Sequence, residues 1–378
     1  MAKLLYFISE DWFFRSHFFD RAAAARDAGH DVVVLTRVAR RGPELRAAGF
    51  RLIALQMDRS GVNVFREFGV LRQVWRAYRA ERPDLVHQVA LKPIVYGSLV
   101  AQCLGIRAVL NAPVGMGYAF TADGAKGRVL RALVGTLLRW LMNPAGSKVV
   151  FENEEDLAWC VRSRCVRPSD GVLIPGAGVD TDLFRPGAPP AGPLVVVMGS
   201  RMLREKGVFE FVEAARILAA RGVPVRCVLA GAPDPENPSS VPRGQLERWH
   251  AEGVVEWLGH RDDMADVLRQ CHIACLPSYY REGLPKFLLE AMACGLPIVT
   301  TDATGCRQAV EAGVTGLLIP TRDVPALVEA LQRLVDDGAE RMRMGAKGRE
   351  RALREFDGRI IARKTLAEYQ RLAPVAAR

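Results

Sequence analysis

Short apolar segments alternate with segments of helical periodicity along almost the whole chain, and this alternation most constrains its fold. Strands that alternate with helices predict parallel, doubly wound sheets and an α/β class. The predicted strands are residues 4–9, 31–36, 51–56, 84–89, 108–113, 147–153, 193–201, 225–231, 254–260, 273–278, 297–302 and 316–320, and residues 171–180 form a further unit of the first half. The predicted helices are residues 18–29, 64–81, 92–104, 129–142, 208–221, 264–270, 285–293, 324–337 and a charged stretch over 340–372.

The length and one turn-rich stretch predict two domains. A chain of 378 residues exceeds the usual range of a single domain. Residues 186–193 read PGAPPAGP and show no periodicity, which is typical of a linker. We therefore predict a doubly wound N-terminal domain over residues 1–186, a linker over 187–193 and a second sheet domain over 194–356.

The cysteines and the N-terminus bear on the compartment. The chain has eight scattered cysteines without a paired CxxC spacing, so we expect a reducing compartment and no metal site. The N-terminus enters a strand without a signal-peptide pattern, and no apolar run reaches the length of a membrane span. These features favour a cytoplasmic protein.

The positive charge is concentrated in the first part of the chain. The net charge is +10, and residues 1–150 carry +11 while residues 151–378 carry −1. This asymmetry indicates an anionic partner for the N-terminal half, and both nucleic acid and an anionic membrane surface fit it. Because no nucleic-acid motif accompanies the arginines, we favour the membrane and expect no nucleic-acid partner.

Two glutamates stand with seven residues between them at the start of one predicted helix. Glu282 precedes the helix, Pro285 suits its first turn, Glu290 lies more than one turn inside it, and Gly295 ends it. At 1.5 Å rise per residue the two carboxylates are roughly 8–12 Å apart. That span suits a nucleotide-sugar, with one carboxylate at the sugar, one at the ribose and the helix N-terminus at the diphosphate. The alternative is a solvated helix face.

Residues 277–302 carry a family resemblance. Their sequence, PSYYREGLPKFLLEAMACGLPIVTTD, resembles the signature of family-4 retaining glycosyltransferases, and the resemblance covers nearly the whole chain. This sequence is most similar to that of bacterial enzymes that extend sugars on a polyprenyl-diphosphate carrier. The resemblance implies the GT-B fold, with two Rossmann-like domains facing across a cleft. It also implies that residues 357–378 cross back to the first domain as a C-terminal helix.

The resemblance assigns a donor site to the second domain. Arg201 and Lys206 match the basic pair that neutralises the leaving nucleoside diphosphate, so no divalent metal or other cofactor is expected. Glu282 lies at the transferred sugar and completes the implied catalytic set. Glu290 accepts hydrogen bonds from the ribose hydroxyls. The other implied donor-binding residues are Gly199, Gly231, Leu284, Pro285 and Lys286. Ala232-Pro233-Asp234 departs from the family's glycine-containing loop.

The acceptor side is less well matched. Many relatives carry a histidine after the strand corresponding to 108–113, whereas this chain has Asn111 there, followed by Gly115-Met-Gly117. Residues 87–97 show the HxxxxKPxxYG pattern of relatives that act on polyprenyl diphosphates, which makes Lys92 a candidate phosphate anchor. The candidate acceptor-binding residues are Asp11, His17, His87, Lys92, Gly115 and Gly117.

Together these features predict a retaining hexosyltransferase. The donor is a UDP-sugar that carries a hexose or N-acetylhexosamine, and the acceptor is a polyprenyl-diphosphate-linked saccharide in surface polysaccharide or glycan assembly. The enzyme is expected on the inner face of the cytoplasmic membrane, because residues 12–14 are aromatic and residues 127–142 combine an apolar face with arginines. Whether 127–142 contacts membrane or core stays open. The alternatives are a GDP-mannose-dependent phospholipid mannosyltransferase and a non-catalytic GT-B nucleotide-binding module.

Overall fold

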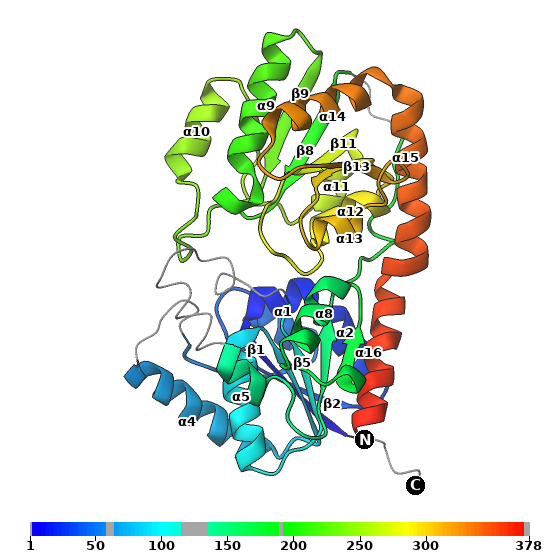
Figure 1. Cartoon of the computed structure of the whole chain (residues 1–378). Helices are drawn as coiled ribbons and strands as arrows, with labels where there is room; N and C mark the ends of the chain where they lie inside the picture. The colour runs from blue at the N-terminus through cyan, green and yellow to red at the C-terminus, as the bar shows by residue number, and fades with distance from the viewer. Residues whose placement is uncertain (1, 58–63, 115–134, 189–191, 374–378) are drawn as a thin grey trace. The chain divides into compact units, whose positions relative to one another are not determined.

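The chain folds into two compact α/β units. The computed structural model describes residues 2–57, 64–114, 135–188 and 192–373. Unit 1 comprises Met1–Ala177 and Gly358–Arg378, and unit 2 comprises Gly178–Asp357 (Figure 1). Each unit has its own parallel sheet, so the predicted α/β class and doubly wound architecture are confirmed.

The sheet of unit 1 has the order β3-β2-β1-β4-β5-β6-β7 in the described part of the chain, and every neighbouring pair is parallel. Its strands are β1 (Lys3–Glu10), β2 (Asp31–Arg37), β3 (Arg51–Ala54), β4 (Leu85–Val89), β5 (Val109–Ala112), β6 (Lys148–Phe151) and β7 (Gly171–Leu173). Its helices are α1 (Asp11–His17), α2 (Phe19–Asp27), α3 (Gly42–Ala47), α4 (Val64–Glu81), α5 (Leu91–Cys103), α8 (Glu154–Arg162), a 3₁₀ turn η1 (Pro168–Asp170) and α16 (Gly358–Leu372).

Helices cover both faces of this sheet. Along β1, Leu4, Tyr6 and Ile8 point to a core that α1, α2 and α16 share, because side chains alternate between the faces of a strand. Leu5 and Phe7 point to the opposite core, which α4 and α5 cover. Both alternating sets are therefore buried, which explains why the predicted strand reads as an unbroken apolar run.

Unit 2 repeats this architecture with a second parallel sheet. In its described residues the sheet order is β10-β9-β8-β11-β12-β13. The strands are β8 (Leu194–Gly199), β9 (Val225–Ala230), β10 (Glu256–Trp257), β11 (Ile273–Leu276), β12 (Ile298–Thr301) and β13 (Gly316–Ile319). The helices are η2 (Arg204–Lys206), α9 (Val208–Ala220), α10 (Arg243–Ala251), α11 (Met264–Arg269), α12 (Lys286–Ala293), α13 (Cys306–Ala309), α14 (Val324–Asp336), α15 (Gly338–Arg351) and a π-helical turn η3 (Ala352–Phe356).

The boundary between the units lies earlier than the sequence analysis placed it. Val179 N donates to Phe356 O at 2.9 Å, and an Arg349 guanidinium nitrogen donates to Phe184 O at 2.8 Å. These bonds hold residues 178–186 to unit 2 rather than to the N-terminal domain. Part of the expected linker, residues 189–191, lies outside the described residues.

The start of the chain also differs from the prediction of one helix over 18–29. The structure has α1 and α2, and the backbone turns out of the helical conformation between them at Phe18 (φ −125°, ψ −9°). Phe14 and Phe18 are buried against β1. Core packing therefore accounts for Phe18 and for Phe14, the last residue of the aromatic run 12–14 that was expected at the surface.

A buried polar cluster ties α16 to the sheet of unit 1. The hydroxyl of Tyr369 on α16 bonds the hydroxyl of Tyr6, and it lies 2.7 Å from Nδ1 of His87. Burial and the positive charge of Arg21 hold the pKa of His87 well below its usual value. His87 is therefore neutral in the folded protein.

The neutral His87 predicts a specific pH dependence of stability. In the unfolded chain this residue binds a proton below about pH 6.5, whereas in the folded chain it does not. Stability is therefore complete above pH 6.5 and falls as pH decreases, at about 1.4 kcal/mol per pH unit. We expect His87→Gln to reduce the loss between pH 6.5 and pH 5 by about 2 kcal/mol, measured by unfolding at several pH values. The exposed His260 provides the control His260→Gln, and equal pH profiles for both variants would contradict the assignment.

Candidate functional site

Four loops of unit 2 meet at the carboxyl edge of its sheet, where open parallel sheets bind ligands. They follow β8, β9, β11 and β12, which are neighbours in the sheet. Backbone bonds join them: Ser200 N donates to Ala230 O at 3.1 Å, and Tyr279 N donates to Glu205 O at 3.0 Å. The predicted residues Gly199, Arg201, Lys206, Gly231 and Glu282 all lie on these loops or at the strand ends before them.

Each basic side chain of the predicted pair contacts a carboxylate. Lys206 Nζ donates to Glu282 Oε2, and both side chains are largely buried. Arg201 Nη1 donates to Asp234 Oδ2 at 2.6 Å. Asp234 belongs to the loop that departs from the family's glycine-containing pattern, so the departure supplies a partner for Arg201. The contacts hold both cations in place at this edge of the sheet.

Ser278 positions the catalytic candidate Glu282. Its hydroxyl lies 2.7 Å from Glu282 Oε1 and accepts from Tyr280 N at 3.2 Å. Ser278 is fully buried at the carboxyl end of β11, and Glu282 is itself 9% exposed. The two carboxylate oxygens of Glu282 thus have different partners, one a hydroxyl and the other an ammonium group. This arrangement fixes the direction in which the carboxylate points.

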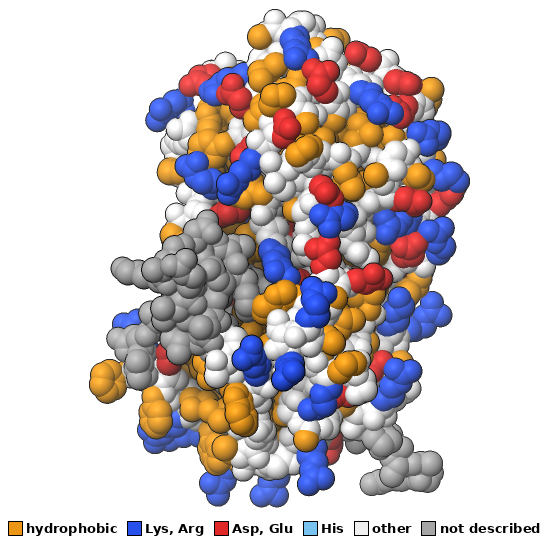
Figure 2. Space-filling model, in the orientation of Figure 1, with side chains coloured by type: hydrophobic (Ala, Val, Ile, Leu, Met, Phe, Trp, Pro, Cys, Tyr) orange, Lys and Arg blue, Asp and Glu red, His pale blue; other side chains and the backbone are white. Residues whose placement is uncertain are grey.

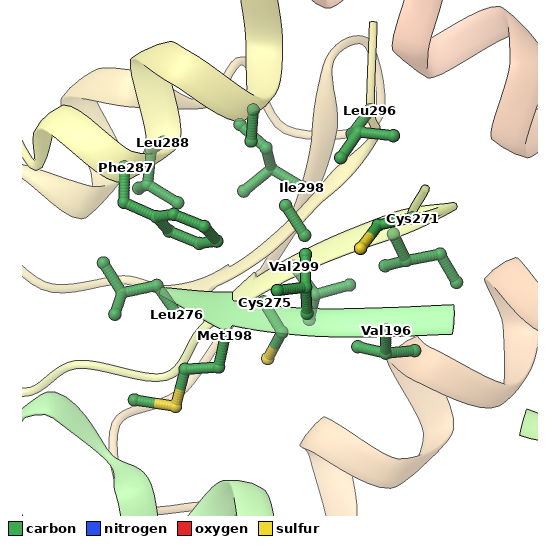
Figure 3. Close-up of a cluster of buried hydrophobic side chains, with 14 of the residues drawn as sticks. Val196, Met198, Cys271, Cys275, Leu276, Phe287, Leu288, Leu296, Ile298 and Val299 are labelled. Carbon is green, nitrogen blue, oxygen red and sulfur yellow. The ribbon is translucent and has the colours of Figure 1, made fainter. Parts of the chain in front are cut away.

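Helix α12 presents Glu290 on its one unburied face. Phe287 and Leu288 point from α12 toward Leu276 and Met198 of the sheet (Figure 3). Within α12 only residues 286 and 290 are partly exposed, because they lie one turn apart on the same face. Lys286 Nζ lies 3.1 Å from a Glu290 oxygen. Leu284 and Pro285 are buried directly before the helix, so packing fixes its N-terminus.

Two of the predicted donor-site glycines allow close packing at this edge. A Cβ on Gly199 would lie 2.3 Å from the ring of Phe287. A Cβ on Gly231 would lie 1.8 Å from Ser200 O, and Gly231 has φ +149°, which other residues rarely adopt. The glycines therefore let the loops after β8 and β9 approach each other and α12.

The predicted acceptor residues of unit 1 are not brought together as one open set. Asp11 is fully buried, and its Oδ2 accepts from Ala39 N and Arg41 N at 2.7 and 2.9 Å. His87 is 1% exposed within the tyrosine cluster. Both side chains are therefore buried in the described part of unit 1 rather than presented at its surface, and their contact with an acceptor stays a prediction. Gly115 and Gly117 lie outside the described residues.

The other two acceptor candidates remain partly exposed. His17 ends α1, and its ring packs against Phe13 with the ring centres 4.2 Å apart. Lys92 Nζ lies 2.8 Å from a carboxylate oxygen of Glu67, and the Tyr96 hydroxyl donates to the other oxygen at 2.5 Å. The lysine and tyrosine of the HxxxxKPxxYG pattern thus both bind one carboxylate on α4. An acceptor phosphate at Lys92 would have to exchange with Glu67.

The helix expected at 127–142 is described only from residue 135. Residues 135–141 are helical, with Leu138 and Met142 buried and with Leu137 and Trp140 exposed. The described part therefore contributes side chains both to the core and to the surface. No helix of the described ranges is long and apolar enough to cross a membrane. Within those ranges, no group of three His, Cys, Asp or Glu side chains is placed to hold a metal ion.

Comparison with known proteins decides the family. The model of the glycosyl transferases group 1 matches residues 179–351, and the model of glycosyl transferase 4-like proteins matches residues 3–151. Anabaena Alr3699/HepE in complex with UDP and glucose has the same fold, with a TM-score of 0.80, 18% identity and coverage of 97% of this chain and 99% of that one. The chain belongs to the GT-B glycosyltransferases.

Two curated glycosyltransferases match most of the chain. The N,N'-diacetylbacillosaminyl-diphospho-undecaprenol alpha-1,3-N-acetylgalactosaminyltransferase of Campylobacter jejuni is 28% identical over 365 residues, which are 92% of this chain and 93% of that protein. The UDP-Gal:alpha-D-GlcNAc-diphosphoundecaprenol alpha-1,3-galactosyltransferase of Escherichia coli is 24% identical over 291 residues, covering 73% of this chain and 72% of that protein. Similarity to glycosyltransferases of lipid-linked saccharides therefore extends over both units.

In this glycosyltransferase, Ser278 and Asp234 contact predicted site residues, and sequence reasoning did not assign either of them to the site. Ser278 stands inside the quoted signature, at a predicted strand end, and that position was the available signal. Asp234 was noted only as a departure from the family pattern. The contact between Arg201 and Asp234 joins the loops after β8 and β9, so spacing alone could not reveal it, whereas Ser278 and Glu282 stand four residues apart on the loop after β11.

Removing the Ser278 hydroxyl should lower turnover more than donor affinity. A hydrogen bond to a charged group contributes about 1.5–3 kcal/mol, so we expect Ser278→Ala to reduce kcat for sugar transfer about tenfold. The KM for the donor should change less than threefold, because Ser278 acts through Glu282. Ser98, another fully buried serine, donates to Gln88 Oε1 at 3.0 Å and provides the control Ser98→Ala. A larger effect on KM than on kcat would contradict the positioning role.

Proposed function

We propose that the chain is a retaining hexosyltransferase that moves a hexose or N-acetylhexosamine from a UDP-sugar to a polyprenyl-diphosphate-linked saccharide. Its product would serve surface polysaccharide or glycan assembly. It would work at the inner face of the cytoplasmic membrane as a peripheral protein. The observation that carries the proposal is the contact between Lys206 and Glu282 at the carboxyl edge of the second sheet, beside Arg201.

The charges at this edge support transfer from a nucleoside diphosphate. When the bond between the anomeric carbon and the phosphate oxygen breaks, its electron pair stays on the phosphate, and negative charge grows there. Arg201 and Lys206 would stabilise that charge, and their fixed positions remove the need to reorganise during the reaction. This is the role that a divalent metal would otherwise take, so we propose transfer without a metal cofactor.

The two glutamates would then act at opposite ends of the donor. Glu290 would accept hydrogen bonds from the ribose diol, since a carboxylate offers two acceptor oxygens. Glu282, held by Ser278 and Lys206, would order the hydroxyls of the transferred sugar and stabilise positive charge on its ring. The acceptor oxygen would bond to the anomeric carbon on the face that the phosphate leaves, and its proton would pass to the departing phosphate.

The relatives support the lipid-linked acceptor. The names of the Campylobacter jejuni and Escherichia coli relatives both give a sugar linked to undecaprenol through a diphosphate as acceptor, and the latter gives a UDP-sugar as donor. In unit 1 the half-exposed Lys92 and His17 are the described candidates for contact with such an acceptor.

A donor panel tests the proposal directly. Purified protein is incubated with radiolabelled UDP- and GDP-sugars and a bacterial lipid extract in magnesium-free buffer. We expect label from one UDP-sugar to enter the organic-extractable lipid, and digestion with phosphodiesterase to release it. Label from GDP-mannose alone, in a phospholipid, would replace the proposal with a phospholipid mannosyltransferase. Binding of UDP without transfer from any donor would favour a non-catalytic module.

A further inference from the structure

The outward face of α4 combines exposed aromatic side chains with arginines. Phe65 is 91% exposed and Phe68 is 70% exposed. Arg72, Arg76 and Arg79 are exposed as well. At 3.6 residues per turn, spacings of three and four place all five side chains on one stripe along the helix. We call this stripe the α4 face.

The opposite side of α4 is anchored in unit 1. Val70, Val74 and Tyr78 are buried in the core beneath the sheet face that α4 covers. The helix therefore cannot rotate to bury its phenylalanines without exposing this core. Figure 2 shows hydrophobic side chains gathered over α4 and α5, with Lys and Arg side chains beside them. Large aromatic side chains in such positions indicate an interaction surface.

The charges of α4 are sorted between its two sides. Its two acidic residues point inward, where Glu67 binds Lys92 and Glu81 binds Arg51 at 2.6 Å. Arg72, Arg76 and Arg79 form no ion pair with any part of the chain that the structure describes. The α4 face is therefore apolar at its N-terminal end, and all the charges along the rest of it are positive.

We propose that the α4 face docks the protein on an anionic lipid surface. Phe65 and Phe68 would enter the boundary between headgroups and acyl chains, while the arginines would bind lipid phosphates. The long apolar stem of arginine allows this geometry, because the side chain can keep its charged end at the headgroups. This docking surface rests on the proposed function, which places the protein at the inner face of the cytoplasmic membrane.

The same face fits nucleic acid less well. Binding sites for single strands combine a positive groove with aromatic rings on which successive bases stack. On α4 the two rings are confined to one end of the stripe, and the outward face of a helix is convex. A lipid surface requires this separation of apolar and charged groups, whereas a base-stacking site requires them to be interleaved.

Vesicle flotation with the full chain tests the proposal. The vesicles contain either phosphatidylcholine alone or equal parts of phosphatidylcholine and phosphatidylglycerol. We expect binding to the anionic vesicles only, and at least about a tenfold loss in Phe65→Ser/Phe68→Ser and in Arg72→Gln/Arg76→Gln/Arg79→Gln. High salt should weaken binding of the wild type. All substituted positions are exposed, and circular dichroism checks that each variant is folded.

Matched variants on unit 2 provide the controls. Met342→Ser removes an apolar side chain that is 70% exposed, and Arg243→Gln/Arg333→Gln/Arg354→Gln removes three exposed charges. Their vesicle binding should stay within about twofold of wild type. Binding of either α4 variant at the wild-type level would overturn the proposal. The proposal would also be overturned if the wild type bound single-stranded RNA but not vesicles, and if the arginine variant lost the binding of RNA.

A transfer assay in detergent separates this inference from the proposed function. With the lipid-linked acceptor dissolved in detergent there is no surface to dock on, so both α4 variants should transfer sugar at the wild-type rate. Transfer by the wild type in detergent without vesicle binding would refute the docking surface alone. Specific vesicle binding without transfer of any sugar would refute the proposed function and leave the docking surface standing.

Discussion

Replacement of Lys206 by methionine should reduce kcat for sugar transfer by about 10²–10³-fold, the effect of removing one group that stabilises charge in a transition state. Methionine keeps the length and the apolar part of the side chain, so the loop after β8 should keep its path. The missing ammonium group is the one that contacts Glu282. In the proposed function it also neutralises the leaving diphosphate. Initial rates with saturating donor measure the change.

The loss of kcat has to be distinguished from a loss of stability of the folded protein. The Lys206 and Glu282 side chains are only 12% and 9% exposed, so the single variant leaves a mostly buried carboxylate without its cation. That defect costs up to about 3 kcal/mol. The double variant Lys206→Met/Glu282→Gln removes the buried charge and should recover most of the unfolding free energy without recovering transfer.

An exposed lysine–glutamate pair provides the matched control for this prediction. Lys347 and Glu350 lie 2.8 Å apart on α15, with side chains 51% and 59% exposed. Such surface pairs contribute little to stability. Lys347→Met should therefore leave stability and transfer close to wild type. Turnover of Lys206→Met at the wild-type rate would refute the donor-site assignment.

The sheet architecture was predictable because it rests on local patterns. Central strands such as β1 and β8 are buried on both faces, and this burial appears in the sequence as unbroken apolar runs. Shorter elements were missed where packing decides them. Helix α8 is one case, although the Asn153 side chain that accepts from Asp156 N and the acidic residues after it are a readable start signal.

The site was predictable to the extent that it lies at strand ends. Arg201, Lys206 and Glu282 follow predicted strands, and the family resemblance selected them among the residues at those strand ends, whereas the order of the strands in the sheet comes from the structure. The same reasoning did not predict the burial of Asp11, which follows β1, or of His87, which lies in the middle of β4. Strand position does not say which helices cover an edge, and α16, which buries His87 through Tyr369, comes from the far end of the chain. Burial of this kind is a property of the tertiary fold.

Replacement of Glu290 by alanine should raise the KM for the donor about 10²-fold, with a smaller effect on kcat. In the proposed function this carboxylate accepts hydrogen bonds from the two ribose hydroxyls, and each bond to a charged group contributes about 1.5 kcal/mol or more. The ribose does not change during transfer, so the loss affects ground state and transition state alike. Titration with UDP and initial-rate measurements report the two effects separately.

Glu290 pairs with Lys286, and a similar pair on another helix of unit 2 provides the control. On α10, Arg243 and Glu247 have the same spacing of four residues, and Nε of the arginine lies 2.7 Å from the carboxylate. Glu247→Ala therefore removes a helical glutamate with a basic partner but should leave UDP binding unchanged. If Glu290→Ala and Glu247→Ala bind UDP equally well, α12 presents only a solvated charge pair, and the ribose contact has to be sought elsewhere on the edge. If only Glu290→Ala loses affinity, the partly exposed face of α12 is the nucleotide-binding surface.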